Sequence, residues 1–178
     1  MATEIVGRIK TIRTTKVIDG GIGAYAANDV VSNEDCCSTT ATAWTFAKVA
    51  EGNGRGGYIT AATVVSESES ITPRLTLFLF NVLPTSNLID NAANTAPDCA
   101  DLAKYIGKID FAALESLGTT DSTVTATPST VGGLPLGFTC AADNDDIFGI
   151  LVTRDAFTQT AGDDMTVILT VEDTHVSA

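Results

Sequence analysis

The strongest cluster of potential cation ligands is an acidic turn near the end of the chain. Asp143, Asp145 and Asp146 flank Asn144, and carboxylate and amide oxygens are the ligands that calcium prefers. The spacing departs from the EF-hand loop, because the loop's fifth position would fall on Ile147 and the glycine that should follow is absent. We therefore expect a solvated acidic turn, with a surface calcium site at Asp143, Asp145 and Asp146 as the alternative.

Residue types for nucleophilic catalysis are present but poorly placed. A serine, threonine or cysteine nucleophile needs a neighbouring base, and the single histidine, His175, lies in the C-terminal tail. The chain lacks a GxSxG motif, and its glycine-rich stretch 52–57 lacks the lysine of a phosphate-binding loop. We predict no enzyme, no catalytic residues and no cofactor. A hydrolase with two carboxylates drawn from the 22 acidic residues is the enzymatic alternative.

The four cysteines are not spaced as zinc ligands. Cys36 and Cys37 are adjacent, while Cys99 and Cys140 stand alone, so no CxxC pair occurs. We predict free thiols at all four positions. A strained bridge between Cys36 and Cys37, or a bridge between Cys99 and Cys140, is left open by the sequence.

Aromatic residues offer a possible sugar platform. Trp44 with Phe46, or Tyr58 beside the glycine-rich stretch, could stack on a carbohydrate ring. The alternation of apolar and polar neighbours favours burial of these rings in the core instead.

Charge is unevenly distributed along the chain. The first 16 residues hold four cations, Arg8, Lys10, Arg13 and Lys16, against Glu4 alone, whereas the whole chain carries a net charge of −12. An acidic body disfavours nucleic acid and anionic membranes as partners. Residues 1–17 are predicted to be either an arm that adds to the sheet edge of a neighbouring subunit or the first strand of the domain.

Length and composition predict one globular domain over residues 18–178. Hydrophobic residues make up 44% of the 178 positions, enough for a sizeable core. Apolar runs such as 77–80 are far shorter than the roughly 20 residues of a membrane span. The N-terminus lacks the features of a secretory signal, so we expect the protein to fold where it is made.

Period-two alternation and turn residues predict an all-β chain. Strands are expected at 4–17, 24–31, 44–49, 57–65, 74–82, 105–111, 122–127, 135–141, 147–157 and 165–172. One or two helical turns are expected at 98–104, with Asp98 behind Pro97 as the N-cap. We predict a bulge or bend within 4–17, a central place for 74–82, and antiparallel pairing of the last two strands across their polar loop. The expected fold is an antiparallel β-sandwich, jelly-roll-like, with an extended basic N-terminal arm and one short helix.

Several segments resemble virion structural proteins of tailed bacteriophages in their order and spacing. They are AYAANDVV at 24–31, PRLTLFLF at 73–80, YIGKID at 105–110, GILVTRDAF at 149–157 and the closing strand. The paired Cys36 and Cys37 and the small residues at 91–96 depart from that pattern.

The resemblance implies a capsid decoration or cement protein with a jelly-roll fold. Such a protein would sit on the outer surface of the head in the virion, after synthesis in the host cytoplasm. Its partners would be the major capsid protein and further copies of itself, as a homotrimer. Arg8, Lys10, Arg13 and Lys16 are the candidate capsid or subunit contacts. A carbohydrate- or receptor-binding module of a head fibre or tail, using loops 52–57 and 142–146, is the alternative.

Overall fold

The computed structural model describes residues 5–18, 23–33 and 41–176, which form ten strands and one short 3-10 helix. The elements are β1 (Ile5–Val17), β2 (Val30–Val31), β3 (Trp44–Phe46), β4 (Gly56–Ser66), β5 (Arg74–Phe80), η2 (Cys99–Asp101), β6 (Tyr105–Ala113), β7 (Ser122–Ala126), β8 (Leu136–Thr139), β9 (Ile147–Thr153) and β10 (Asp164–Val176). Asp98 caps η2 by accepting a hydrogen bond from the Ala100 N–H, as the sequence predicts.

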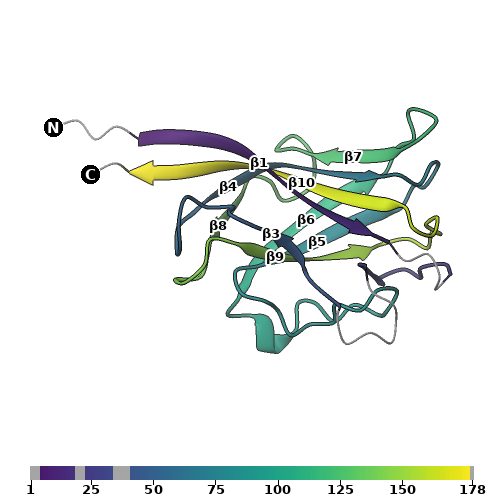
Figure 1. Ribbon diagram of the computed structural model, residues 1–178, viewed down its shortest axis with the longest axis horizontal. Helices are drawn as coiled ribbons and strands as arrows, with labels where there is room; N and C mark the ends of the chain where they lie inside the picture. Colours follow the sequence, from purple (N-terminus) through teal and green to yellow (C-terminus); the bar gives the residue numbers. More distant parts are fainter. Residues whose placement is uncertain (1–4, 19–22, 34–40, 177–178) are drawn as a thin grey trace.

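The strands form two antiparallel sheets that pack as a sandwich (Figure 1). Sheet 1 has the order β1-β10-β4-β7, and β8 also pairs with β4. Sheet 2 has the order β2-β9-β5-β6, and β3 also pairs with β9. The strand 74–82 is therefore central, as predicted, because β5 lies between β9 and β6.

The strand order is that of a jelly roll. β2 and β3 both pair with β9, and β7 and β8 both pair with β4, so β2 with β3 and β7 with β8 each correspond to one jelly-roll strand. β1 then pairs with β10, β2 with β9, β4 with β7, and β5 with β6, so that early strands pair with late ones in nested order. This rolled hairpin in two sheets is the jelly-roll arrangement, which confirms the predicted fold class.

The predicted pairing of the last two strands is wrong. β10 pairs with β1 and β4 in sheet 1, whereas β9 pairs with β2, β3 and β5 in sheet 2. β9 is buried at six of its seven positions, so it needs an interior place with cover on both sides. β10 alternates buried and more exposed residues, which suits a sheet with one wet face.

The predicted strands differ from the structure in two details. β1 pairs with β10 without a break from Ile5 opposite Val176 to Val17 opposite Asp164, so of the predicted bulge or bend the bulge is absent from this pairing. The irregularity lies in the pairing of β4 with β10, where Thr60 has no direct partner. The expected strand 24–31 is interrupted by a turn at Asn28, which adopts a φ of 72°.

The main core lies between the sheets, and a smaller one lies outside sheet 2. The smaller core contains Phe80, Ile150 and Val152, with Tyr105 against its edge. The segment 81–104 belongs to this region, and two buried carboxylates hold it. Asp90 accepts hydrogen bonds from the Tyr25 hydroxyl and the Ser32 N–H, and Asp101 accepts from the N–H groups and hydroxyls of Thr85 and Ser86.

No helix among the described residues is long and apolar enough to cross a membrane.

Candidate interaction surface

The outer face of sheet 1 is an uncovered, threonine-rich surface, which we call the threonine face. Its side chains alternate with the core residues of β1, β10, β4 and β7, and none of them is buried. Seven of its sixteen residues are threonines. The face consists of Ile9, Thr11, Arg13, Thr15, Val17, Tyr58, Ala61, Thr63, Val65, Thr123, Thr125, Asp164, Thr166, Ile168, Thr170 and Glu172.

The residues of the threonine face lie in rows across the strands. Thr15 pairs with Thr166, and their hydroxyls share a hydrogen bond of 2.8 Å. Thr63 pairs with Thr125 in the same way at 2.9 Å. Cross-strand threonine pairs hold the side chains in fixed rotamers, so this surface is ordered before any partner arrives.

The threonine face carries one positive and two negative side chains. Arg13, Asp164 and Glu172 are its charged residues, and this share of three in sixteen is close to the 18% of charged residues in the whole chain. The other residues of the face are threonines, aliphatic residues and Tyr58. From this set, the sequence alone marks Arg13 as a candidate contact and Tyr58 as a candidate sugar platform.

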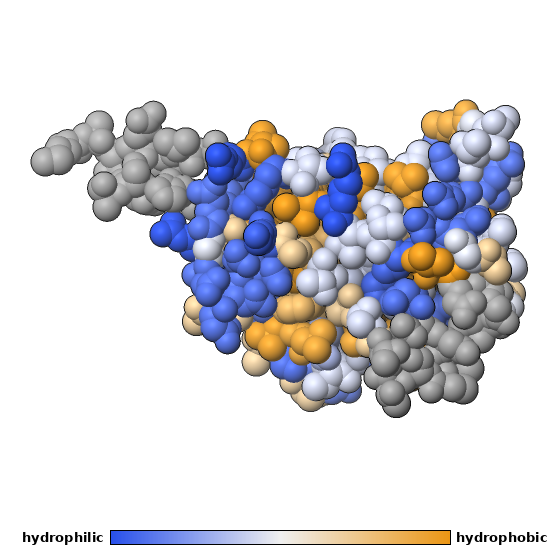
Figure 2. Space-filling view, viewed as in Figure 1, coloured by the Kyte–Doolittle hydropathy of each residue, from blue (hydrophilic) through white to orange (hydrophobic). Residues whose placement is uncertain are grey.

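Exposed aliphatic side chains lie on β1 at the edge of the threonine face. Ile9 is 72% exposed and Val17 is 55% exposed. On the side of the molecule seen in Figure 2, hydrophobic residues form separate patches among polar ones.

The four predicted contact residues on β1 do not share one surface. Arg8 and Arg13 are exposed, and the Arg8 guanidinium lies 2.7 Å from the Glu51 carboxylate. Lys10 points inward, where its ammonium lies 3.1 Å from the Asp173 carboxylate. Lys10 is therefore engaged within its own subunit.

Lys16 is buried rather than available for a partner. Its ammonium donates to the Ser32 hydroxyl at 3.1 Å, to the Asn33 side-chain oxygen at 2.7 Å and to the Thr42 carbonyl, and it lies 5.5 Å from the centre of the Trp44 ring. Burial of a lysine is acceptable only with such partners. We therefore exclude Lys16 from the contact surface.

The acidic turn uses its oxygens for its own loop. Asp146 accepts a hydrogen bond of 2.8 Å from the Lys48 N–H, and the Asn144 side chain accepts one of 3.0 Å from the Asp146 N–H. Within the described ranges, no group of three or more His, Cys, Asp or Glu side chains could hold a metal ion. Asp143 and Asp145 thus stay weak calcium candidates.

The two cysteines that the structure describes, Cys99 and Cys140, differ in burial. Cys99 is exposed and Cys140 is buried, and both are free, as predicted. Burial, with the negative charges of Asp145 and Asp146 nearby, raises the pKa of the Cys140 thiol to about 11. Cys36, Cys37 and the side chain of His175 lie outside the described residues.

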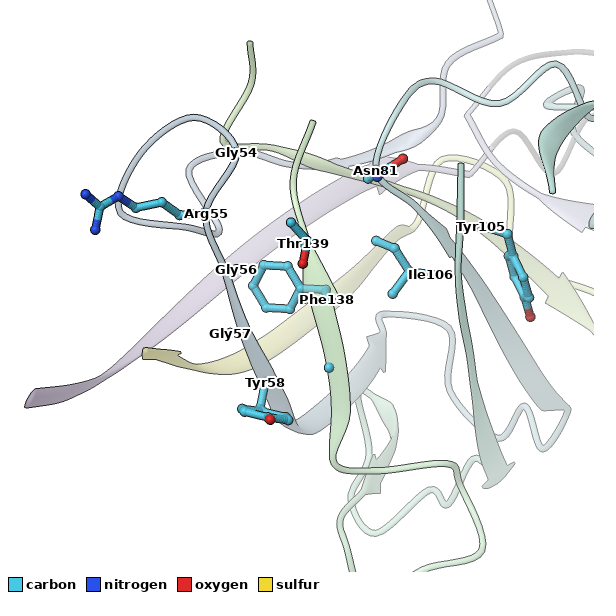
Figure 3. A pocket seen from close by; sticks show the side chains of 11 residues that line it. Gly54, Arg55, Gly56, Gly57, Tyr58, Asn81, Tyr105, Ile106, Phe138 and Thr139 are labelled. Atoms are coloured by element: carbon cyan, nitrogen blue, oxygen red, sulfur yellow. The ribbon is translucent and has the colours of Figure 1, made fainter. Parts of the chain in front are cut away.

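The aromatic candidates separate into core and surface residues. Trp44 and Phe46 are fully buried, and the Trp44 ring N–H donates to the Val31 carbonyl at 2.9 Å. Tyr58 is 48% exposed and lines an open groove of about 620 Å³ at one end of the sandwich. In Figure 3, Arg55 points away from this groove, and Ile106 lies between β8 and β6.

Comparisons with known proteins give no family. No family model matches the chain, and no curated protein matches it. A chain from the structure of Desmodium yellow mottle tymovirus is similar, with a TM-score of 0.35 and 9% identity over 100% of this chain and 91% of that one. A chain from Mud crab tombus-like virus has a TM-score of 0.34 and 7% identity over 100% and 84%.

A chain from the full particle of Israeli acute paralysis virus has a TM-score of 0.34 and 14% identity, over 96% of this chain and 69% of that one. Likenesses at this level do not decide the function. The fold assignment therefore rests on the strand order above.

Proposed function

We propose that this protein is a non-enzymatic virion structural protein that decorates the capsid of a tailed bacteriophage. In this proposal it binds the major capsid protein on the outer surface of the head and bridges neighbouring capsomers. The observation that carries the proposal is the threonine face, a broad outer surface of sheet 1 that cross-strand threonine pairs hold in order. The resemblance of its sequence to phage virion proteins supports the same conclusion.

The two sheets differ in a way that favours docking through sheet 1. Sheet 2 has a second small core on its outer side. The outer residues of sheet 1 are instead half-buried or exposed, and they make hydrogen bonds to one another. A preorganised surface loses little side-chain entropy when it binds, so a four-stranded face suits a stable contact.

Arg13 is the basic residue of β1 that we keep as a contact, because it is exposed on the threonine face. It could orient an acidic body on a partner through complementary charge, whereas Arg8 pairs with Glu51 of its own subunit. Binding would stabilise the head by mass action, because the bound protein adds interface that capsid expansion or rupture must break. A specific contact of this kind needs about 1,000 Å² of buried area or more.

Charge substitutions in the threonine face test the docking proposal. We expect both Thr63→Glu and Thr63→Lys to weaken binding to purified capsids at least tenfold, because either charge would lose water in the contact. Val131 is fully exposed on a loop, so Val131→Glu and Val131→Lys are the matched controls. Normal capsid binding by both Thr63 variants would exclude this face.

Heat stability tests the cementing role separately. Capsids that carry the protein should release their contents at a higher temperature than capsids without it. An unchanged release temperature at full occupancy would show that the protein decorates the head without strengthening it.

A carbohydrate- or receptor-binding role is the second candidate, and the groove beside Tyr58 favours it. None of its eleven lining residues is acidic, and Tyr58, Asn81 and Thr139 offer a ring, an amide and a hydroxyl around it. A glycan array compares the unaltered protein with Tyr58→Ala. This role would be favoured over cementing if the unaltered protein bound a glycan, Tyr58→Ala abolished that binding, and the unaltered protein did not bind capsids.

A further inference from the structure

Among the residues that the structure describes, one edge of β1 has no pairing strand. Its thirteen residues pair with β10 on one side, and no residue in the described part of the chain forms a ladder with the other side. The backbone groups that point outward from this edge are a template for a further strand.

The edge lacks most devices that keep sheet edges apart. β1 contains no proline, and its register with β10 is unbroken. Lys10 and Lys16 are turned inward to partners in their own subunit. Ile9 and Val17 are exposed instead. Long, regular edges with exposed aliphatic residues are sites of strand addition.

The start of β1 also extends beyond the body of the protein. The neighbouring pairing of β10 with β4 ends at Gly57 opposite Asp173, so beyond that point β1 and β10 form a two-stranded ribbon (Figure 1). A two-stranded ribbon is marginally stable alone. A strand from another molecule along β1 would support it.

We propose that a second copy of this chain pairs with β1, antiparallel and through β1 of the second copy. Thr11 lies opposite Thr11 of the second copy, and Ile9 lies opposite Arg13 of the second copy. This register uses all thirteen residues of each strand and joins the two threonine faces into one continuous surface. It does not depend on capsid binding.

Full overlap favours this register over its neighbours. Both strands have thirteen residues, so a shift of two residues in either direction leaves two residues of each β1 without a partner. A shift of one residue would bring outer-face side chains against core-face positions, so the fully overlapped register is the one that remains.

The proposed register also gives the exposed aliphatic residue a cover. The methylene groups of Arg13 would pack on Ile9 of the other copy, with Glu172 beyond Ile9 in the same row. Such a contact is the same on both subunits, so it closes as a twofold dimer. It therefore differs from the homotrimer that the sequence resemblance implies.

Two substitutions at Ile9 test the dimer by sedimentation equilibrium of the full chain. We expect Ile9→Lys to raise the dimer dissociation constant at least tenfold, because it places a cation opposite Arg13. Ile9→Glu should keep or lower that constant, because it places an anion there. Leu117 is 81% exposed, and Leu117→Lys serves as the matched control. A monomer at all concentrations, or equal weakening by both Ile9 variants, would overturn the proposal.

Cross-linking tests the register directly. In a Cys99→Ser background, Thr11→Cys should form a disulfide-linked dimer on mild oxidation, because the two cysteines would face each other across the twofold axis. Thr15→Cys should form no more disulfide-linked dimer than the Cys99→Ser parent does. A linked dimer through position 15 but not 11 would contradict this register.

Discussion

The ammonium of Lys10 lies 3.1 Å from the carboxylate of Asp173, on the inner side of the β1–β10 pair. Asp173 is 1% exposed, whereas Lys10 keeps some contact with solvent. The ion pair therefore binds the first strand to the last at the point where β4 ends its pairing with β10. It also turns one of the four cations of β1 away from the free edge.

Removal of the Lys10 charge should destabilise the fold. Lys10→Met leaves the Asp173 carboxylate buried without its cation, so we expect a loss of about 2 to 3 kcal/mol in the free energy of unfolding. Arg8→Met is the control, because Arg8 is 72% exposed in its ion pair with Glu51 and should cost under about 0.5 kcal/mol. Urea unfolding at one protein concentration measures both. Equal effects would show that the Lys10 pair adds nothing beyond surface charge.

Asp101 should make stability depend on pH. Burial alone would raise the pKa of its carboxyl, but hydrogen bonds from Thr85, Ser86 and Lys104 outweigh burial and hold the pKa well below its usual range. A carboxyl with a depressed folded-state pKa stabilises the protein above its unfolded pKa, about 3.9, and this contribution is lost as the pH falls through the folded-state value.

The Asp101→Asn substitution measures that contribution. We expect it to lower the free energy of unfolding by about 2 kcal/mol at pH 6, and the gap from the unaltered protein should narrow below about pH 4. Asp98→Asn should have little effect, because asparagine is as good an N-cap as aspartate. A gap for Asp101→Asn that stays constant down to pH 2 would refute the assigned pKa direction.

The fold class was readable from the sequence because local patterns carry it. Alternation located β4, β5, β6 and β7 to within a few residues, and the two apolar faces of 74–82 predicted a central strand. Asp98 behind Pro97 predicted the N-terminus of η2. These signals depend on a strand or cap and its nearest neighbours, so a single sequence contains them.

The errors concern partners that lie far away in the chain. A polar loop between β9 and β10 suggests a hairpin, but the loop crosses between sheets because β9 needs cover on both faces. The inward turn of Lys16 depends on Ser32, Asn33 and Thr42, which no periodicity connects to β1. The threonine face could be recognised only once four strands were placed side by side.

The two described cysteines should differ sharply in reactivity. Cys140 is buried and its pKa is raised to about 11, so little thiolate exists at neutral pH, whereas Cys99 is exposed. Iodoacetamide labelling of the native protein, read by peptide mass spectrometry, should modify Cys99 and leave Cys140 intact until urea unfolds the chain. Prompt labelling of Cys140 in the native protein would contradict its burial.

Gly149 is the position where a single methyl group should disturb the core. It is the third of the seven residues of β9. A Cβ there would come within 2.8 Å of the Leu77 side chain, 3.2 Å of the Phe46 ring and 3.3 Å of the Trp44 Cβ. We expect Gly149→Ala to cost about 1 to 3 kcal/mol by overpacking. Because Trp44 is the sole tryptophan, its fluorescence spectrum should also change.

Gly118→Ala is the matched control for this substitution, because a Cβ at Gly118 has no atom within 4 Å. Its effect on the free energy of unfolding should stay within about 0.5 kcal/mol, with an unchanged Trp44 spectrum. If Gly149→Ala were as stable as Gly118→Ala, the packing of β9 against the Phe46 ring and the Trp44 Cβ would have to be looser than these distances indicate. The glycine is therefore explained by tertiary packing, since β-strand propensity alone would favour almost any other residue at this point.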